Sequence, residues 1–148
     1  MRDALGADGT RGCYRQRSFI ARGIVLPGSS DRPVVDEAPL LGIHDLVNQR
    51  TATGRPFNPA EALTPWQALH TFTLGSAYAA FEETRKGSLE VGTLADFAIL
   101  SADPTAVDPT TIAEIQVDGT VVGGRLAYDR VGFGADPSGQ RPWIPCPL

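Results

Sequence analysis

The sequence contains few of the residues that build disulfide frameworks and histidine-rich metal sites. Among its 148 residues there are two cysteines, Cys13 and Cys146, and two histidines, His44 and His70. Two isolated cysteines without a Cys-x-x-Cys pair suit a reducing compartment better than a disulfide scaffold. Apolar runs of about 18 residues, the length of a membrane-spanning helix, are also missing. Charge and glycine stand at the N-terminus where a signal peptide has its apolar stretch. We therefore expect a cytoplasmic protein without a membrane partner.

The chain also lacks a strong excess of positive or negative charge. The formal net charge is −4 at pH 7, and acidic and basic residues are interspersed along the chain. Binding to the phosphate backbone of nucleic acids needs a basic stripe, which this sequence lacks, so nucleic acid is not an expected partner. Hydrophobic residues make up 42% of the chain and charged residues 20%, values typical of a globular protein with a real core.

The first half of the chain alternates between helical and extended patterns. Residues 14–22 are compatible with a helix that ends at Gly23. Residues 24–26, Ile-Val-Leu, then predict a short buried strand. Apolar residues at helical spacing predict a second helix over residues 40–50, which Gly54 can end.

The clearest local signal is a helix start at Thr64-Pro65-Trp66-Gln67. Threonine at the cap, proline at the first helical position and Gln67 three residues after Thr64 form a capping box. An apolar stripe follows from Trp66 to Phe81. Gly75 interrupts that stripe, and we expect it to divide the stretch into two helical pieces.

Beyond residue 85 the pattern changes to short strands. Residues 95–100 predict one strand, and residues 115–122 predict a hairpin that turns at Asp118-Gly119. A last strand is expected over residues 125–128. The strand over residues 95–100 and the hairpin over residues 115–122 should belong to one small antiparallel sheet, and the proline- and glycine-rich residues 131–148 should have little regular structure. The fold class expected is therefore α/β plus β.

Asp31 is the residue that the pattern singles out for chemistry. It follows the predicted strand at residues 24–26, and catalytic side chains of α/β barrels gather at the carboxyl ends of their strands. The plainer alternative is a Ser-Asp turn residue that caps its own loop. From the residues alone both interpretations stay open.

The histidines do not offer the spacing of a metal site. His44 and His70 lie on different predicted helices, and neither belongs to an i, i+2 or i, i+4 pair. We interpret both as surface or helix-packing residues. Four further polar or reactive residues are interpreted as structural, without a partner that would activate them: Cys13, Glu90, Asp96 and Cys146.

Several motifs, taken in order, resemble one known family. Ser29-Ser30-Asp31-Arg32-Pro33-Val34 is similar to a Gly/Ser-Ser-Asp-x-Pro-Val motif, and the Lys86-Gly87-Ser88-Leu89-Glu90 stretch is similar to a widely shared signature. Val122-Gly123-Gly124-Arg125 resembles a closing strand turn. Residues 14–129 thus resemble the C-terminal part of the amidohydrolase superfamily, in the family 3 branch that includes N-substituted formamide deformylase-like proteins.

This resemblance implies a fold and a place within it. The family fold is a metal-dependent (β/α)₈ barrel with a small β-sandwich formed by both chain ends. The chain would be a C-terminal portion, because a barrel needs about 200 residues or more. The implied division has four parts. An irregular N-terminus covers residues 1–13, and the last barrel strand with its helices covers residues 14–84. The C-terminal part of the sandwich covers residues 85–130, and a tail covers residues 131–148.

The resemblance also implies a chemistry, the hydrolysis of carbon–nitrogen bonds other than peptide bonds, with small amide-type substrates. Asp31 matches the aspartate that binds or faces the metal and accepts a proton from the attacking water. The family's other metal ligands have no counterparts here. A divalent metal, zinc by resemblance, is therefore expected in the complete enzyme, with no tight binding to this chain alone.

Two readings of the chain follow from that departure. In the first, it is the C-terminal portion of a hydrolase, through a truncated gene, a mispredicted start or a split enzyme with a complementary N-terminal chain. In the second, it is a non-catalytic remnant, or a structural half that pairs with a complementary chain.

Overall fold

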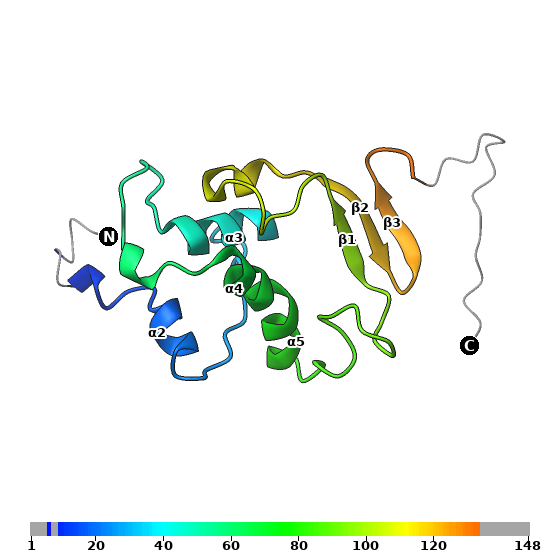
Figure 1. Ribbon diagram of the computed structural model, residues 1–148, viewed down its shortest axis with the longest axis horizontal. Coiled ribbons are helices and arrows are strands. Elements are labelled where there is room, and N and C mark those ends of the chain that lie inside the picture. The colour runs from blue at the N-terminus through cyan, green and yellow to red at the C-terminus, as the bar shows by residue number, and fades with distance from the viewer. Residues whose placement is uncertain (1–5, 7–8, 134–148) are drawn as a thin grey trace.

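The computed structural model describes residue 6 and residues 9–133. Helices occupy one part of the molecule, and a three-stranded sheet occupies the other (Figure 1). The elements in chain order are α2 (Gln16–Ile20), α3 (Pro39–Asn48), η1 (Pro59–Glu61), α4 (Pro65–His70), η2 (Thr71–Gly75), α5 (Ser76–Ala79), β1 (Phe97–Leu100), η3 (Pro109–Glu114), β2 (Val117–Val122) and β3 (Arg125–Asp129). None of these helices combines the length and apolar character needed to cross a membrane.

The core lies among the helices. Ile43 from α3, Leu63, Ala68 from α4 and Ile112 from η3 form one buried cluster. Ile112 is completely buried although it lies far along the chain, between β1 and β2. The 3₁₀ helix η3 therefore leaves the sheet region to pack against α3, which ties the later part of the chain to the earlier helices.

The predicted start of α4 is confirmed. The Gln67 N–H donates to Thr64 Oγ1 at 3.2 Å, and the Thr64 N–H donates to Gln67 Oε1 at 3.0 Å. This reciprocal pair satisfies two backbone donors that the helix itself leaves free. Pro65 occupies the first helical position, as its fixed φ and missing N–H favour.

The expected break at Gly75 is replaced by a change in helix type. α4 continues through the π-helical turn η2 into α5, so the backbone stays helical past the glycine. The apolar stripe expected behind the cap is also only partly buried, because Trp66 is 68% exposed and Phe81 is 92% exposed. Small and polar residues form the buried positions of this helical run instead: Ala68, Thr71, Gly75 and Ala77.

The small antiparallel sheet is confirmed, but its turn lies later than expected. The strand order is β1-β2-β3, and Asp118-Gly119 lies within β2 rather than between strands. Gly119 pairs with Ile99 on one side and Asp129 on the other. The turn is made by Gly123 and Gly124, whose φ angles of 56° and 74° are those of a two-residue type I′ hairpin. A type I′ turn needs a positive φ at both of its central residues, and two adjacent glycines adopt it more easily than Asp-Gly does.

The strand expected at residues 24–26 does not form in the described part of the chain. A strand needs a hydrogen-bonded neighbour, and β1, β2 and β3 pair only with one another. The Ile24 N–H instead donates to Phe19 O at 3.1 Å and closes the end of α2. Ile24 and Val25 consequently remain 46% and 40% exposed, which contradicts the expected burial.

The helix predicted over residues 40–50 is confirmed with an earlier end. α3 stops at Asn48 because Gln49 adopts a left-handed conformation with φ of 46°, and the Gln49 N–H donates to Asp45 O. Gly54 belongs to the next turn, where its N–H donates to Thr51 O at 2.8 Å. The expected irregular tail lies largely outside the described residues.

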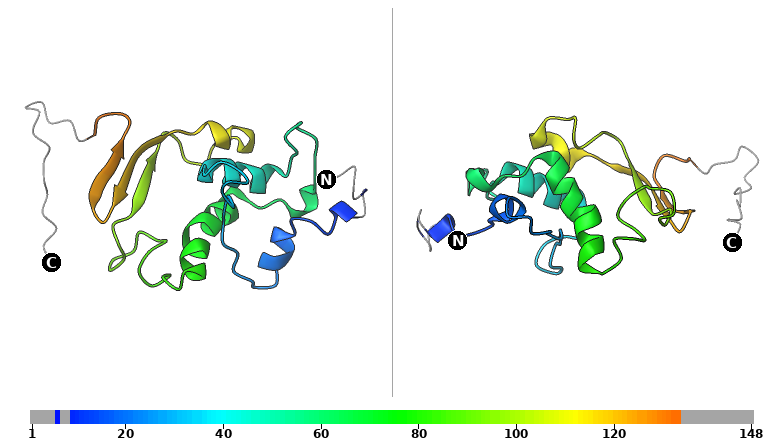
Figure 2. Two further views of the ribbon diagram at one scale, coloured as in Figure 1. Left: turned by 180° about the vertical axis from the view of Figure 1, so that it is seen from behind. Right: turned by 60° about the horizontal axis from the view of Figure 1, so that its bottom comes forward.

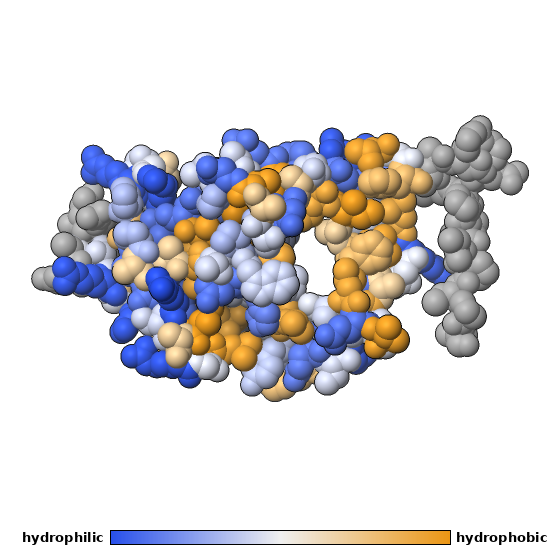
Figure 3. All heavy atoms as spheres, viewed as in Figure 1, coloured by the Kyte–Doolittle hydropathy of each residue, from blue (hydrophilic) through white to orange (hydrophobic). Residues whose placement is uncertain are grey.

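The sheet and the helical part are distinct in the further views as well. In both further views the sheet extends away from the helices (Figure 2). The space-filling view shows an opening between the helical part and the sheet, with apolar side chains on the surface of the sheet (Figure 3). Exposed apolar residues of the strands include Phe97, Val122, Leu126 and Tyr128.

Candidate functional site

A groove of about 880 Å³ lies in the helical part. Its walls come from the start of α2, the segment around Asp31, and one face of α3. The opposite face of α3 carries Ile43 into the core. The groove adjoins the core, because Leu46 and Phe72 line the groove and also pack against the core cluster, and the exposed Asp31 lies on the groove's rim.

Phe72 lines the groove, and its ring packs against two glycines. A Cβ added at Gly28 would lie 2.6 Å from the Phe72 ring, and one added at Gly42 would lie 2.4 Å from it. Both distances are shorter than any ordinary contact, so these two positions need glycine for the ring to fit. Phe72 comes from the π-helical turn η2, which therefore brings the ring between the Asp31 segment and α3.

The other end of the groove is held by aromatic and polar contacts. Tyr14 and Phe57 meet edge to face, with ring centroids 5.6 Å apart and planes at 84°. Glu61 fixes α2 beside them, because it accepts hydrogen bonds from the Ser18 N–H at 2.8 Å and the Ser18 hydroxyl at 2.5 Å. These hydrogen bonds, the hydroxyl first, lower the pKa of Glu61 below its usual value. Helix α2 is thereby anchored to η1 through its central residue, Ser18.

Asp31 itself is exposed and lies in a tight turn. Its φ is 52°, a left-handed conformation that aspartate tolerates better than most residues. The Asp31 N–H donates to Ser29 Oγ at 3.1 Å, and the Val34 N–H donates to Asp31 O at 2.9 Å. The turn thus uses the backbone of Asp31, which leaves the carboxylate at the groove available for other partners.

The structure does not bring either histidine to Asp31. His44 lies on α3 with Nδ1 3.1 Å from Asp45 Oδ1, and it does not line the groove. His70 lies at the end of α4 beside a separate apolar cleft that includes Ile24 and Trp66. Within residues 9–133 no three His, Cys, Asp or Glu side chains lie together in a way that could hold a metal ion.

The remaining polar candidates have structural partners. Asp96 Oδ1 accepts a hydrogen bond from the Gly123 N–H at 2.6 Å and so links the residue before β1 to the β2–β3 turn. The Glu90 carbonyl accepts from the Thr93 N–H at 3.2 Å within a loop. Cys13 Sγ lies 3.6 Å from Gly9 O, while Cys146 lies outside the described residues.

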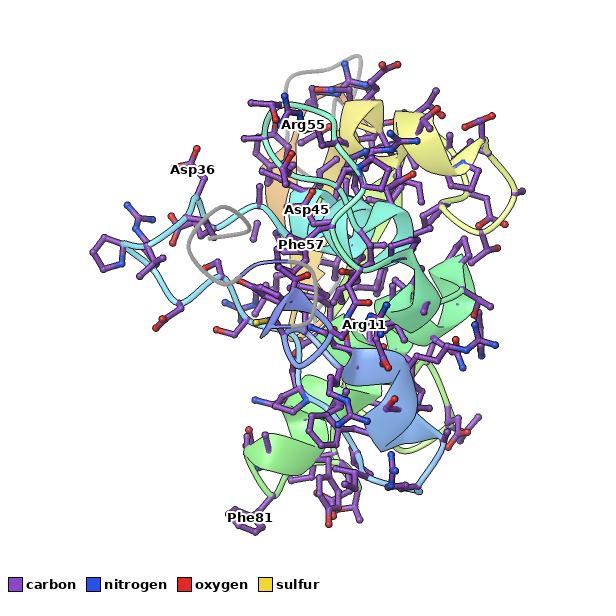
Figure 4. All side chains as sticks on the ribbon, turned by 90° about the vertical axis from the view of Figure 1, so that its left-hand side faces the viewer. Arg11, Asp36, Asp45, Arg55, Phe57 and Phe81 are labelled. Atoms are coloured by element: carbon purple, nitrogen blue, oxygen red, sulfur yellow. The ribbon has the colours of Figure 1, made fainter. Side chains whose placement is uncertain are left out.

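Sequence reasoning missed two further carboxylates on the groove, Asp36 and Asp45. Asp36 lies on the segment that projects from the body of the molecule, and Asp45 lies on α3 (Figure 4). A signal for Asp45 was present, because Leu41, Asp45 and Gln49 recur at a helical spacing of four and all line the groove. No comparable periodicity marks Asp36.

Comparison with known proteins gives the family of the chain. The model of the amidohydrolase family, Amidohydro_3, matches residues 1–128. YtcJ of Bacillus subtilis, an amidohydrolase by name, is 33% identical over 131 residues, which cover 86% of this chain and 25% of that protein. The N-substituted formamide deformylase of Arthrobacter pascens is 33% identical over 116 residues, which cover 78% of this chain and 21% of that protein.

Solved structures agree in fold. A metal-dependent hydrolase from Pyrococcus horikoshii superposes with a TM-score of 0.61 at 29% identity, over 70% of this chain and 22% of that one. An amidohydrolase from Thermotoga maritima superposes with a TM-score of 0.60 at 19% identity, over 79% of this chain and 26% of that one. The chain spans about a quarter or less of the curated relatives' length. The resemblance inferred from its motifs is confirmed, and the chain belongs to the amidohydrolase family, in its family 3 branch.

Proposed function

We propose that this chain forms part of a metal-dependent hydrolase that acts on carbon–nitrogen bonds other than peptide bonds, with small amide-type molecules as substrates. Family membership supports the reaction class. The name of the Arthrobacter pascens relative, an N-substituted formamide deformylase, supports the substrate class. The proposal retains the cytoplasmic location expected from the sequence.

Asp31 is the proposed catalytic residue. The observation that carries this role is its position on the rim of the groove, with its backbone used by the turn and its carboxylate exposed. A carboxylate in such a place can accept a proton from an attacking water and pass it to the leaving nitrogen. The left-handed φ of Asp31 supports the same role, because unusual backbone conformations cluster at functional sites.

The described residues do not fit a complete metal site. A catalytic zinc typically takes three protein ligands and keeps one open position, and no suitable group of three is present in the part of the chain that the structure describes. We therefore propose that Asp31 is one ligand to a divalent metal, zinc by resemblance, and that the others belong to a complementary part of the enzyme. Residues 14–84 would complete its barrel, residues 85–130 would join its β-sandwich, and residues 1–13 and 131–148 would flank them.

A chimera tests the proposal directly. The chain would replace the matching 116 residues of the Arthrobacter pascens enzyme, and hydrolysis of an N-substituted formamide would be measured. Removal of a general base commonly costs about 10²–10⁴-fold in rate. We therefore expect Asp31→Asn to lower kcat of an active chimera by that factor.

Asp36→Asn is the matched control, because Asp36 is also an exposed carboxylate lining the groove. It should leave kcat within about twofold if only Asp31 accepts the proton. Full activity of Asp31→Asn would reduce Asp31 to a turn residue. Equal losses in both variants would show that the groove needs negative charge rather than one proton acceptor.

A second candidate function is that of a structural half that pairs with a complementary chain without chemistry of its own. The apolar surface favours it, because Ile24, Val25 and Trp66 are exposed around one cleft. The 148-residue chain should then bind the dye ANS or associate, and lose both on pairing. A monomer that melts cooperatively and binds no ANS would contradict this candidate.

A further inference from the structure

We propose that Ser76 is a positioning residue that fixes the backbone of Gly28 and, through it, the location of Asp31. The proposal rests on the role given to Asp31 above. Ser76 Oγ lies 3.1 Å from Gly28 O and 2.9 Å from Thr71 O, so its single proton is shared between the two carbonyls. The Gly28 N–H donates to the same Thr71 O at 2.7 Å. Both polar groups of Gly28 are therefore held by one short stretch of helix.

The π-helical turn explains how this stretch can hold a loop. η2 covers Thr71–Gly75 and ends immediately before Ser76. In a π turn the backbone hydrogen bonds run from i to i+5, and such turns occur frequently at functional sites. Here the Thr71 carbonyl, at the start of the turn, accepts from both Gly28 and Ser76.

Close packing limits the movement of the loop from two further directions. A Cβ added at Gly75 would lie 2.1 Å from Leu26 O, so the backbone of residue 26 lies directly against the helix. The Phe72 ring lies against Gly28 in the same way. These contacts keep the loop from moving closer to the helix, but they do not set the orientation of the Gly28 peptide groups. The hydrogen bonds of Ser76 and Thr71 do that.

The link from Gly28 to Asp31 is short and itself ordered. Only Ser29 and Ser30 separate the two residues, and Ser29 Oγ accepts the Asp31 N–H. A rotation at Gly28 would therefore move the Asp31 turn as a unit. A proton acceptor misplaced by about 1 Å can lower the rate about 100-fold without loss of substrate binding.

Thr73 provides a matched control within the same helical run. Its Oγ1 donates to Leu69 O at 3.0 Å and lies 3.5 Å from His70 O, so these hydrogen bonds return to its own helical run. Ser76→Ala and Thr73→Ala thus both remove one helix hydroxyl, but only the first removes a hydrogen bond to Gly28. Ser76→Thr keeps the hydroxyl and should rescue the effect.

The experiment has two readouts. In the 148-residue chain, NMR should show that Ser76→Ala displaces the amide resonances of residues 28–31 and speeds Gly28 amide exchange about tenfold. The Gly28 N–H keeps its bond to Thr71 O, but loss of the bond to Gly28 O makes local opening of the loop easier. In the formamide deformylase chimera, Ser76→Ala should lower kcat about tenfold or more while KM stays within about twofold. Thr73→Ala should do neither.

The outcomes separate this inference from the proposed function. Ser76→Ala effects no larger than those of Thr73→Ala, while Asp31→Asn still abolishes activity, would overturn the positioning role alone. Displaced resonances together with a fully active Asp31→Asn chimera would overturn the catalytic role proposed for Asp31 and leave Ser76 as a structural residue of the loop. If Ser76→Ala fails to fold, Ser76→Thr decides: loss of kcat despite the retained hydroxyl would contradict the proposal.

Discussion

The helical part of the molecule, from α2 to α5 together with η3, contains a buried apolar core, although Trp66 and Tyr78 stay exposed, whereas no residue of the three strands belongs to that core. Ile43, Leu63, Ala68 and Ile112 meet in one core. In β3, by contrast, all five residues are exposed. Burial of apolar area is the main favourable term in folding. The helical part therefore has a source of stability that the sheet has only in small measure.

The sheet depends instead on its backbone ladder and on polar contacts at its ends. β2 pairs with both β1 and β3, Asp96 holds the Gly123 N–H, and Arg130 pairs with Asp118. Arg130 is exposed and Asp118 is partly buried, and ion pairs near the surface contribute little, with a median of about 0–1 kcal/mol. The comparison indicates that the helical part is stable by itself. The sheet should unfold locally at a small free-energy cost unless another surface covers its apolar side chains.

The largest expected effect is at Ile112, in the core of the helical part. Its side chain is fully buried, so Ile112→Ala leaves a cavity and should destabilise the protein by about 2–5 kcal/mol. The control, Leu126→Ala in β3, truncates a residue that is 38% exposed and should cost less than about 1 kcal/mol. Urea unfolding followed by circular dichroism measures both. Equal losses would mean that the sheet contributes to stability as much as the core does.

The second expected effect is confined to the sheet. Gly124 has a φ of 74°, and a side chain with a Cβ costs about 1–2 kcal/mol in that conformation. Gly124→Ala should therefore speed amide exchange in β2 and β3 without changing it in α3. Gly124→Asn should cost less, because asparagine tolerates the left-handed region. Faster exchange in α3 as well would show that the two parts unfold together.

That turn also shows where the sequence was sufficient and where it was not. The existence of a small antiparallel sheet was predictable from short apolar runs, but Asp118-Gly119 and Gly123-Gly124 were both plausible turns. Register depends on pairing with β1, a strand distant in sequence, which places Gly119 opposite Ile99. A local motif cannot supply that information. The capping box at Thr64, whose hydrogen bonds span three residues, was predicted in full.

The candidate site follows the same rule. Asp31 could be named as a candidate because its motif is contiguous in sequence, and its role stays a prediction. The groove brings together Tyr14, Asp45 and Phe72 from separate elements, which the sequence does not show. The strand expected at residues 24–26 was wrong for a related reason. Its apolar pattern was correctly recognised, but a strand also needs a paired neighbour, and none lies against it in the described residues.

A smaller effect is expected at the start of α4, within the helical part. Thr64→Ala removes the side-chain acceptor of the capping box and should cost about 1 kcal/mol. Thr64→Ser keeps the oxygen and should recover most of that loss. Thermal melts give the totals, and amide exchange should place the change in α4 rather than in β1. An unchanged melting temperature for Thr64→Ala would indicate that tertiary packing alone determines where α4 begins.

The smallest expected effect concerns the pKa values of two carboxyl groups, Asp103 and Asp108, each of which begins an Asp-Pro-Thr turn. Asp108 Oδ1 accepts hydrogen bonds from the Thr110 hydroxyl at 2.6 Å and the Thr110 N–H at 2.8 Å, which lower the pKa of its carboxyl. The pKa of Asp103 is lowered in the same way by Thr105. A carboxyl whose pKa is lower in the native than in the unfolded state stabilises the protein above its unfolded pKa, about 4. That contribution is lost as the pH falls from about 4 through the native value.

Thr110→Ala tests this at the turn that starts η3. Loss of the hydroxyl should raise the Asp108 pKa toward its usual value, although the remaining N–H keeps part of the shift. A carbon-13 NMR titration of the carboxyl groups measures it, with Thr105→Ala as the control that should move Asp103 alone. Since η3 carries Ile112 into the core, acid should loosen this contact more in wild type than in Thr110→Ala. If Thr110→Ala leaves the Asp108 titration unchanged, the hydroxyl is not the source of the lowered pKa.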